Sequence, residues 1–269
     1  MAELPVLSSY RVLLGSRIHS QLVYRSSFWL TVLTSVTVGV VEFAEIYAIL
    51  HNVPALGGLD LAEAALVFAL ANIGFALADL VFGQLDAVPT YLRMGRLETL
   101  LVRPMPVMLQ LVAADFQLRR LGRAAVGVLI LLLALAGLDI TYSPAVTYLL
   151  VVTPIVGGAI YGALFVLAGG IQFFVIEGSE ITNSFVYGGG YAGQVPGSVH
   201  LLPVRVLFTF VVPATLTAYL PALLILHLPG PALLPAWLGW LAPLFAGWIW
   251  LLAWLVWRAG IRHFSGAGG

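Results

Sequence analysis

The sequence predicts an all-α integral membrane protein with six transmembrane helices, both termini cytoplasmic and an N-terminal amphipathic interfacial helix. Three observations lead to this fold class. Of the 269 residues, 61% are hydrophobic and only 9% are charged, whereas about a quarter of an average soluble domain is charged. Apolar windows of about 20 residues, the length of a spanning helix, recur six times. The arginines gather in alternate connections between these windows.

The six apolar windows are bounded by charged or turn-forming residues. They cover residues 28–50, 63–83, 118–138, 145–176, 205–226 and 237–257. The third window has a short uninterrupted apolar run, so we expect Arg119, Arg120 and Arg123 to extend from its first turns toward the headgroups. The fourth window is long and contains the glycine pairs Gly157-Gly158 and Gly169-Gly170. We expect it to be tilted, broken or extended into water.

The distribution of basic residues predicts the orientation. All 12 are arginine, and they precede the first window, lie between the second and third, stand at the entry of the third, open the fifth and follow the sixth. The connections 51–62, 139–144 and 227–236 contain none. Because cytoplasmic loops carry the excess of basic residues, we expect every arginine and both termini on the cytoplasmic side.

The chain is expected to have three parts. Residues 1–27 form an amphipathic segment on the cytoplasmic surface, with Val12 and Leu22 toward lipid. Residues 28–257 form the six-helix transmembrane domain, and residues 258–269 form a cytoplasmic tail. We find no internal repeat and no linker to a second domain.

The composition excludes several kinds of chemistry. The chain has no cysteine and no lysine, so a thiol nucleophile, a thiolate metal site and a Walker A P-loop are absent. The five histidines are scattered over predicted loops and helix ends and favour no metal site. The net charge of zero gives no reason to expect a nucleic-acid partner. We therefore expect no catalytic residue, metal or cofactor on this chain.

Four polar residues within the apolar windows need an explanation. Glu42 and Glu45 share one face of the first helix, and a charge at that depth costs several kcal/mol unless it is paired, protonated or beside a cavity. They fit a proton or cation relay, the lining of a substrate route or a buried interhelical contact, and no arginine is expected at their depth. Asn72 in the second window is a candidate partner. Asp79 is expected to pair with an interfacial arginine.

One segment is more specific. Residues 91–106, Tyr-Leu-Arg-Met-Gly-Arg-Leu-Glu-Thr-Leu-Leu-Val-Arg-Pro-Met-Pro, resemble the G-x-L-(D/E)-x-x-L-x-R-P string of ABC type-2 exporter permeases, in a six-span bacterial subfamily of mostly unassigned substrate. Other landmarks agree in order: Tyr24-Arg25, Gly57-Gly58 with Glu63, Val212-Pro213, Leu220-Pro221-Ala222 and the closing residues 257–268. The chain departs at Glu98, where the subfamily commonly has aspartate, and this change keeps the acidic group.

The resemblance implies a multi-pass permease of the bacterial plasma (inner) membrane that exports an amphipathic or hydrophobic compound. Its expected partners are two copies of an ABC ATPase subunit, a second permease subunit that is identical or homologous, and membrane lipid. ATP and Mg²⁺ then belong to the ATPase chain. The resemblance also implies a coupling segment at about residues 85–103. Its polar contacts with the ATPase are expected from Arg93, Arg96, Glu98 and Arg103, and its apolar anchors are expected to be Leu97, Leu100 and Leu101.

Two other functions remain open at the level of the sequence. The first is a proton- or cation-coupled secondary transporter that uses Glu42 and Glu45, although six spans without an inverted repeat argue against it. The second is a membrane scaffold or immunity protein without transport. The sequence does not indicate the substrate.

Overall fold

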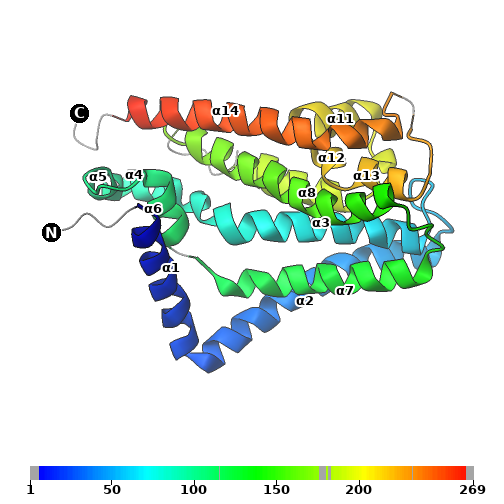
Figure 1. The fold of residues 1–269 in the computed structure, drawn as a ribbon, viewed down its shortest axis with the longest axis horizontal. Helices are drawn as coiled ribbons and strands as arrows, with labels where there is room; N and C mark the ends of the chain where they lie inside the picture. The colour runs from blue at the N-terminus through cyan, green and yellow to red at the C-terminus, as the bar shows by residue number, and fades with distance from the viewer. Residues whose placement is uncertain (1–5, 115, 176–179, 181–182, 232, 265–269) are drawn as a thin grey trace.

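The computed structural model describes residues 6–114, 116–175, 180, 183–231 and 233–264. Throughout this part of the chain the regular secondary structure is helical, and five helices are long and apolar enough to cross a membrane. They are built around α2 (Arg25–Asn52), α3 (Leu61–Phe82), α7 (Leu121–Gly137), α8 (Pro144–Ile171) and α14 (Ala242–His263). Figure 1 shows these helices along the length of the molecule. The predicted all-helical membrane fold is confirmed.

Helix α3 lies at the centre of the bundle. It begins at a capping box, in which Asp60 and Glu63 each accept a hydrogen bond of 2.9 Å from the other's backbone N–H. Its spanning window is 72% buried, compared with 11% for α2. A helix that is apolar on all sides belongs in the interior, and α3 accordingly packs against both α7 and α8.

Small residues set the close approach of α3 and α8. A Cβ atom placed on Gly74 would lie 3.2 Å from backbone atoms of Gly157 and Gly158, so only glycine fits there without a shift. Close backbone contact of this kind is typical of helix pairs in membranes. Helix α8 is continuous and ends at Ile171. The glycine pairs of the fourth window are therefore packing surfaces and not breaks.

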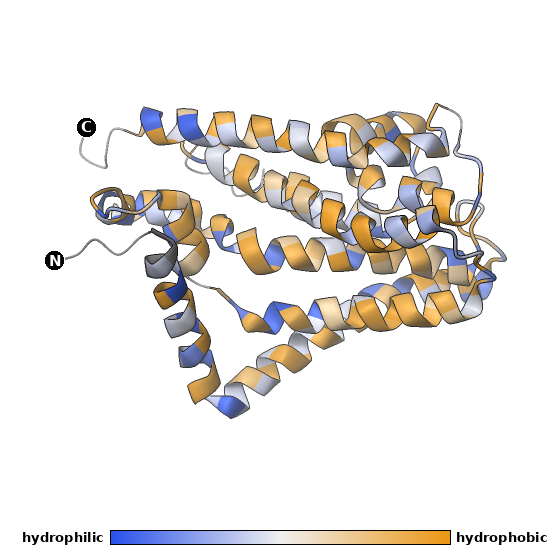
Figure 2. Ribbon diagram, viewed as in Figure 1, coloured by the Kyte–Doolittle hydropathy of each residue, from blue (hydrophilic) through white to orange (hydrophobic). Residues whose placement is uncertain are grey.

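One end of the molecule is rich in arginine and is formed by short helices. After α3 the chain continues through η1 (Gly83–Ala87), α4 (Val88–Arg93), α5 (Arg96–Leu101), α6 (Val107–Ala114) and η2 (Leu118–Arg120). Gly95, at φ +64°, turns the chain between α4 and α5, a conformation that glycine adopts easily. Figure 2 shows hydrophilic residues collected at this end and apolar residues along the helices.

The N-terminal helix α1 (Val6–Val23) leaves the bundle at an angle to α2 (Figure 1). The helix breaks at Tyr24, whose φ and ψ of −98° and 72° are not helical. Gln21 attaches α1 to the bundle, because its side chain donates to the Phe116 carbonyl and accepts from the N–H of Leu118 at 2.9 Å. Val12 is 66% exposed, as expected for a residue facing lipid. The position of α1 on the cytoplasmic surface stays a prediction.

The fifth apolar window is a bent helical hairpin and not a straight crossing. Its first arm consists of α11 (Leu202–Val206) and the π-helical turn η5 (Leu207–Val211), and its second arm of α12 (Ala214–Thr217) and α13 (Tyr219–Ile225). The arms are bent by 64° relative to each other. The bend includes Pro213, which lacks the N–H that a continuous helix needs.

Contacts along α8 show that the second arm returns toward the end from which the first arm started. In chain order, Val211 lines a cavity together with Leu164, Thr217 lies against Gly157, and Pro221 lines a second cavity together with Tyr148. The hairpin thus enters the bundle and turns back. The chain passes from the arginine-rich end to the opposite end earlier, between Ile171 and Ser198, through η3 (Asn183–Tyr187) and α10 (Gly188–Gln194).

This topology places Arg205 at the end opposite the other loop arginines. Its guanidinium donates to the carbonyls of Gly197, Ser198 and His200 at 3.1, 2.8 and 3.0 Å. The Ser198 hydroxyl in turn donates to the Gly57 carbonyl at 2.6 Å, in the connection between α2 and α3. The expectation that all arginines lie on one side is therefore wrong for Arg205. The three backbone carbonyls accept charge-assisted hydrogen bonds from the guanidinium and so stabilise Arg205 at this end.

Candidate functional site

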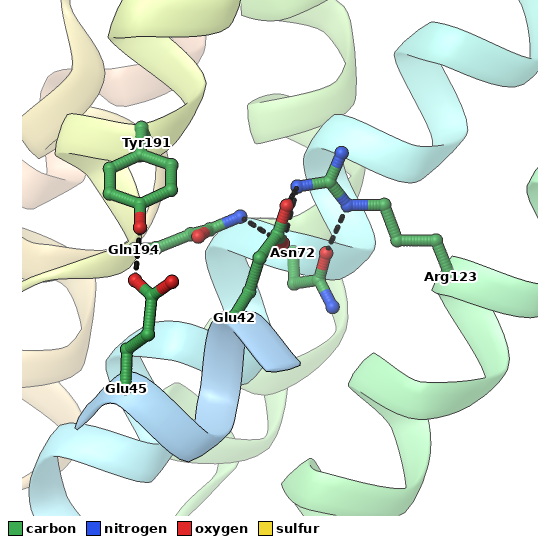
Figure 3. A network of polar contacts seen from close by, with 6 residues as sticks. All are labelled: Glu42, Glu45, Asn72, Arg123, Tyr191 and Gln194. Carbon is green, nitrogen blue, oxygen red and sulfur yellow. Dashed lines mark hydrogen bonds and ion pairs between the residues drawn. The ribbon is translucent and has the colours of Figure 1, made fainter. Parts of the chain in front are cut away.

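A polar network joins four helices in the middle of the bundle (Figure 3). Its centre is Arg123, in the first turn of α7. Nη2 of Arg123 lies 2.7 and 2.6 Å from the two carboxylate oxygens of Glu42 on α2, and Nε donates to Oδ1 of Asn72 on α3 at 2.8 Å. The guanidinium also lies 4.7 Å from the ring centroid of Phe75, a cation–π contact.

Helix α10 contributes the other members of this network. Nε2 of Gln194 donates to Glu42 at 3.2 Å, and the hydroxyl of Tyr191 donates to Glu45. Asn72 and Gln194 are buried, whereas Glu45 and Tyr191 are exposed on the surface of this chain. The network therefore runs from the partly buried ion pair of Glu42 and Arg123 to a polar patch on the outside of the bundle.

The network corrects the expectation that no arginine reaches the depth of Glu42. Arg123 was expected to extend toward the headgroups, but it points into the bundle. Helix α7 has only 17 residues, about 26 Å at 1.5 Å per residue. Its first two turns lie beside the middle of α3, where Arg123 binds Asn72 and Gly127 packs against Ile73. An arginine inside a membrane needs a partner such as a carboxylate. Asn72 and Glu42 both accept hydrogen bonds from this arginine, so the predicted contact between Asn72 and Glu42 is indirect.

A second polar group lies nearer the arginine-rich end. Arg120 forms an ion pair with Asp79, with 3.2 Å between Nη1 and Oδ1, and donates to the Asp79 backbone carbonyl. The arginine partner expected for Asp79 is therefore present. The hydroxyl of Tyr187 donates to Asp86, which connects η3 to η1.

The predicted coupling segment lies at the arginine-rich end, and its residues differ in accessibility. Its polar residues Arg93, Arg96, Glu98 and Arg103 are exposed. Among the three leucines, Leu101 is 42% exposed, whereas Leu97 and Leu100 are 0% and 8% exposed and belong to the core of this chain. The role of the segment in coupling stays a prediction, and Leu101 is the leucine that a partner can reach.

The buried leucines attach the segment to the rest of the fold. Gln110, on α6, donates to the carbonyls of Leu100 and Met105 at 2.8 and 2.7 Å. Leu85, on η1, lies against Gly169 of α8. The short helices are thereby held to α3 and α8. No cluster of three or more metal-ligating side chains occurs among the residues that the structure describes.

Comparison with known proteins gives one match. A family model described as "ABC-2 family transporter protein" matches residues 36–268, which cover all of the spanning helices except the first part of α2. Searches of curated proteins and of solved structures found no match.

Proposed function

The chain belongs to the ABC-2 family of transporter proteins, and from this membership we propose that it is the permease subunit of an ATP-driven exporter in the bacterial inner membrane. It is a multi-pass membrane protein and a transport subunit rather than a catalytic one. In the proposed assembly, two permease subunits, identical or homologous, bind two copies of an ATPase chain that holds ATP and Mg²⁺. The proposed substrate is an amphipathic or hydrophobic compound, in keeping with the apolar and aromatic composition.

The observation that carries this proposal is the family match over residues 36–268. The matched range includes the whole segment 85–103. The chain has no lysine and so no P-loop of its own, and a separate ATPase chain supplies what it lacks.

The outer side of the coupling segment offers a small docking surface. Leu101, on α5, provides an exposed apolar anchor, and two exposed residues of opposite charge accompany it, Arg93 at the end of α4 and Glu98 on α5. Apolar anchors supply most of the affinity of such a contact, while charges around them set orientation and partner choice. We expect these three residues to contact the ATPase.

The inner side of the same segment supports transmission of movement. Leu97 is fully buried, and Gln110 ties the end of α5 to α6 through its bond to the Leu100 carbonyl. Through η1, which contacts α8 at Gly169, a displacement of α5 reaches the two central helices. Closely packed elements move together and do not deform independently. ATP-driven closure of the ATPase pair is therefore proposed to move α3 and α8.

The exposed part of the polar network fits the substrate route or the contact with the second permease. Glu45 and Tyr191 are exposed on this chain, and a carboxylate that faces hydrocarbon is costly. We expect the second permease subunit or a water-filled route between the subunits to cover this face.

The structure gives less support than the sequence does to the alternative of a proton- or cation-coupled transporter. It depended on Glu42 and Glu45 as groups without a basic partner. Glu42 instead has a basic partner, because it forms an ion pair with Arg123.

Purification from the native membrane in a mild detergent tests the proposal. We expect the tagged chain to recover a nucleotide-binding chain in equal amount, together with ATPase activity. An unrelated tagged multi-pass protein from the same membrane is the control for non-specific capture. Recovery of this chain without an ATPase under several mild conditions would contradict the proposal and favour a gradient-driven transporter.

A further inference from the structure

A cavity of about 350 Å³ lies at the arginine-rich end, between α1, the coupling segment and α6. Its volume falls within the range of small-molecule sites, about 300–1,000 Å³. Three of its lining residues are arginines: Arg17 from α1, Arg96 from α5 and Arg103 from the connection between α5 and α6. The cavity thus joins the N-terminal helix to the coupling segment.

Among the residues that the structure describes, the arginines of this cavity have no anionic partner. No carboxylate is among the lining residues, and within the described ranges of the chain the two ion pairs involve other arginines, Arg120 and Arg123. Like charges gathered around one cavity repel each other, and a bound anion relieves this repulsion. Guanidinium groups bind phosphate oxygens through two parallel hydrogen bonds.

The rest of the lining suits a phospholipid better than a small inorganic anion. Tyr91 and Thr99 supply hydroxyl groups for hydrogen bonds, whereas Leu13 and Ala113 are apolar. Leu13 lies on α1 and is 38% exposed, so the lining includes an apolar side chain that stays accessible. A headgroup bound among the arginines leaves its acyl chains beside apolar side chains.

The fold holds the cavity in shape. Gln110 donates to the carbonyls of Leu100 and Met105, which lie on both sides of Arg103 and fix the course of its loop. On the opposite wall, α1 is tied to the bundle by Gln21. The arginines are therefore presented by three separately anchored elements.

We propose that this cavity binds the phosphate group of an anionic phospholipid in the leaflet at the arginine-rich end. The site assigns Arg96 and Arg103 to a lipid and leaves Arg93 to the ATPase contact. Binding there connects α1 to α5, so anionic lipid stabilises the position of the coupling segment. The inference stands apart from the proposed function, because lipid binding is measurable on the isolated chain without ATPase or transported substrate.

Lipid titration of the purified, delipidated full-length chain tests the site. The probes are short-chain phosphatidylglycerol and phosphatidylcholine with the same acyl chains, followed by calorimetry. We expect the wild-type chain to bind phosphatidylglycerol at least tenfold more tightly than phosphatidylcholine. The variant Arg96→Ala/Arg103→Ala is expected to lose this preference. The matched control Arg93→Ala/Arg262→Ala removes two exposed arginines outside the cavity and is expected to keep it.

Two further arms make the result specific. Arg96→Gln/Arg103→Gln is a second neutral variant of similar side-chain length, for use if the alanine variant does not fold. Inorganic phosphate at the concentration of the lipid is expected to leave phosphatidylglycerol bound. Equal affinity for the two lipids, equal loss in both double variants, or displacement by inorganic phosphate would each overturn the proposal.

Discussion

Arg123 binds both carboxylate oxygens of Glu42 and thereby ties α7 to α2. Helix α2 has a spanning window that is only 11% buried, so apolar packing within this chain does little to hold it. The ion pair and its neighbours, Asn72 and Gln194, supply a directional contact in its place. The position of α2 therefore depends on electrostatics more than that of α3 or α8.

Removing both partners of this ion pair is expected to destabilise the protein by less than the sum of the two single removals. Glu42→Gln leaves the Arg123 guanidinium without its counter-charge. Because the side chains of this pair are 17% and 14% exposed, the cost is expected to be less than the roughly 3 kcal/mol lost when one partner of a fully buried pair is removed. The double variant Glu42→Gln/Arg123→Met is expected to fall short of the summed single effects by at least about 1 kcal/mol. The free energy of unfolding by SDS titration measures all four states. Additive effects would contradict the coupling.

The contact between α3 and α8 is expected to reject any side chain at Gly74. Gly74→Val places carbon atoms where the backbone of Gly157 and Gly158 lies 3.2 Å from the Cβ position, and overpacking of this kind costs about 1–3 kcal/mol. Gly247→Val is the matched control, because no atom lies within 4 Å of its Cβ position. Both variants are compared by their melting temperature in detergent. A similar melting temperature for the two would show that the helices are not closely packed.

Labelling of introduced cysteines is expected to distinguish the hairpin from a straight fifth crossing. The chain has no cysteine, so single sites report without background. Leu201 is 78% and Met94 60% exposed. We expect a membrane-impermeant maleimide to label Leu201→Cys from the same side as Asn52→Cys and from the opposite side to Met94→Cys. Labelling of positions 201 and 94 from the same side would contradict the hairpin and support a straight fifth crossing.

Two leucines of the coupling segment are expected to respond differently to the same substitution. Leu101→Asp changes an exposed side chain, so we expect it to weaken ATPase recovery while leaving the unfolding midpoint unchanged. Leu97→Asp places a charge in the core, which is expected to lower stability by several kcal/mol. Pull-down and thermal unfolding of both variants separate the two effects. Normal ATPase recovery with Leu101→Asp would contradict the docking surface.

The crossings were predictable because the length and apolarity of a spanning helix follow from the thickness of the bilayer. The windows 28–50 and 63–83 fall within or close to α2 and α3. The fifth window was misread because averaged hydropathy does not distinguish one long apolar helix from two short ones joined at Pro213. The proline itself was the available signal, since it interrupts the backbone hydrogen bonding of a helix.

The polar network was only partly predictable. Glu42, Glu45 and Asn72 stand out because they are polar residues in apolar windows. Tyr191 and Gln194 lie about 150 positions away along the chain, and no local pattern links them to the glutamates. The short apolar run of α7 was the signal for Arg123, because it leaves too few residues to place this arginine outside the membrane.

Site-specific photocrosslinking from Leu101 tests the central claim, that this permease is driven by a separate ATPase chain. A photoreactive amino acid at position 101 is introduced in the native membrane, with position 201, at the opposite end, as the matched control. Our account predicts that position 101 captures a chain with nucleotide-binding motifs and that position 201 does not. Capture of no such chain from position 101, in a membrane where the permease is folded, would contradict the account.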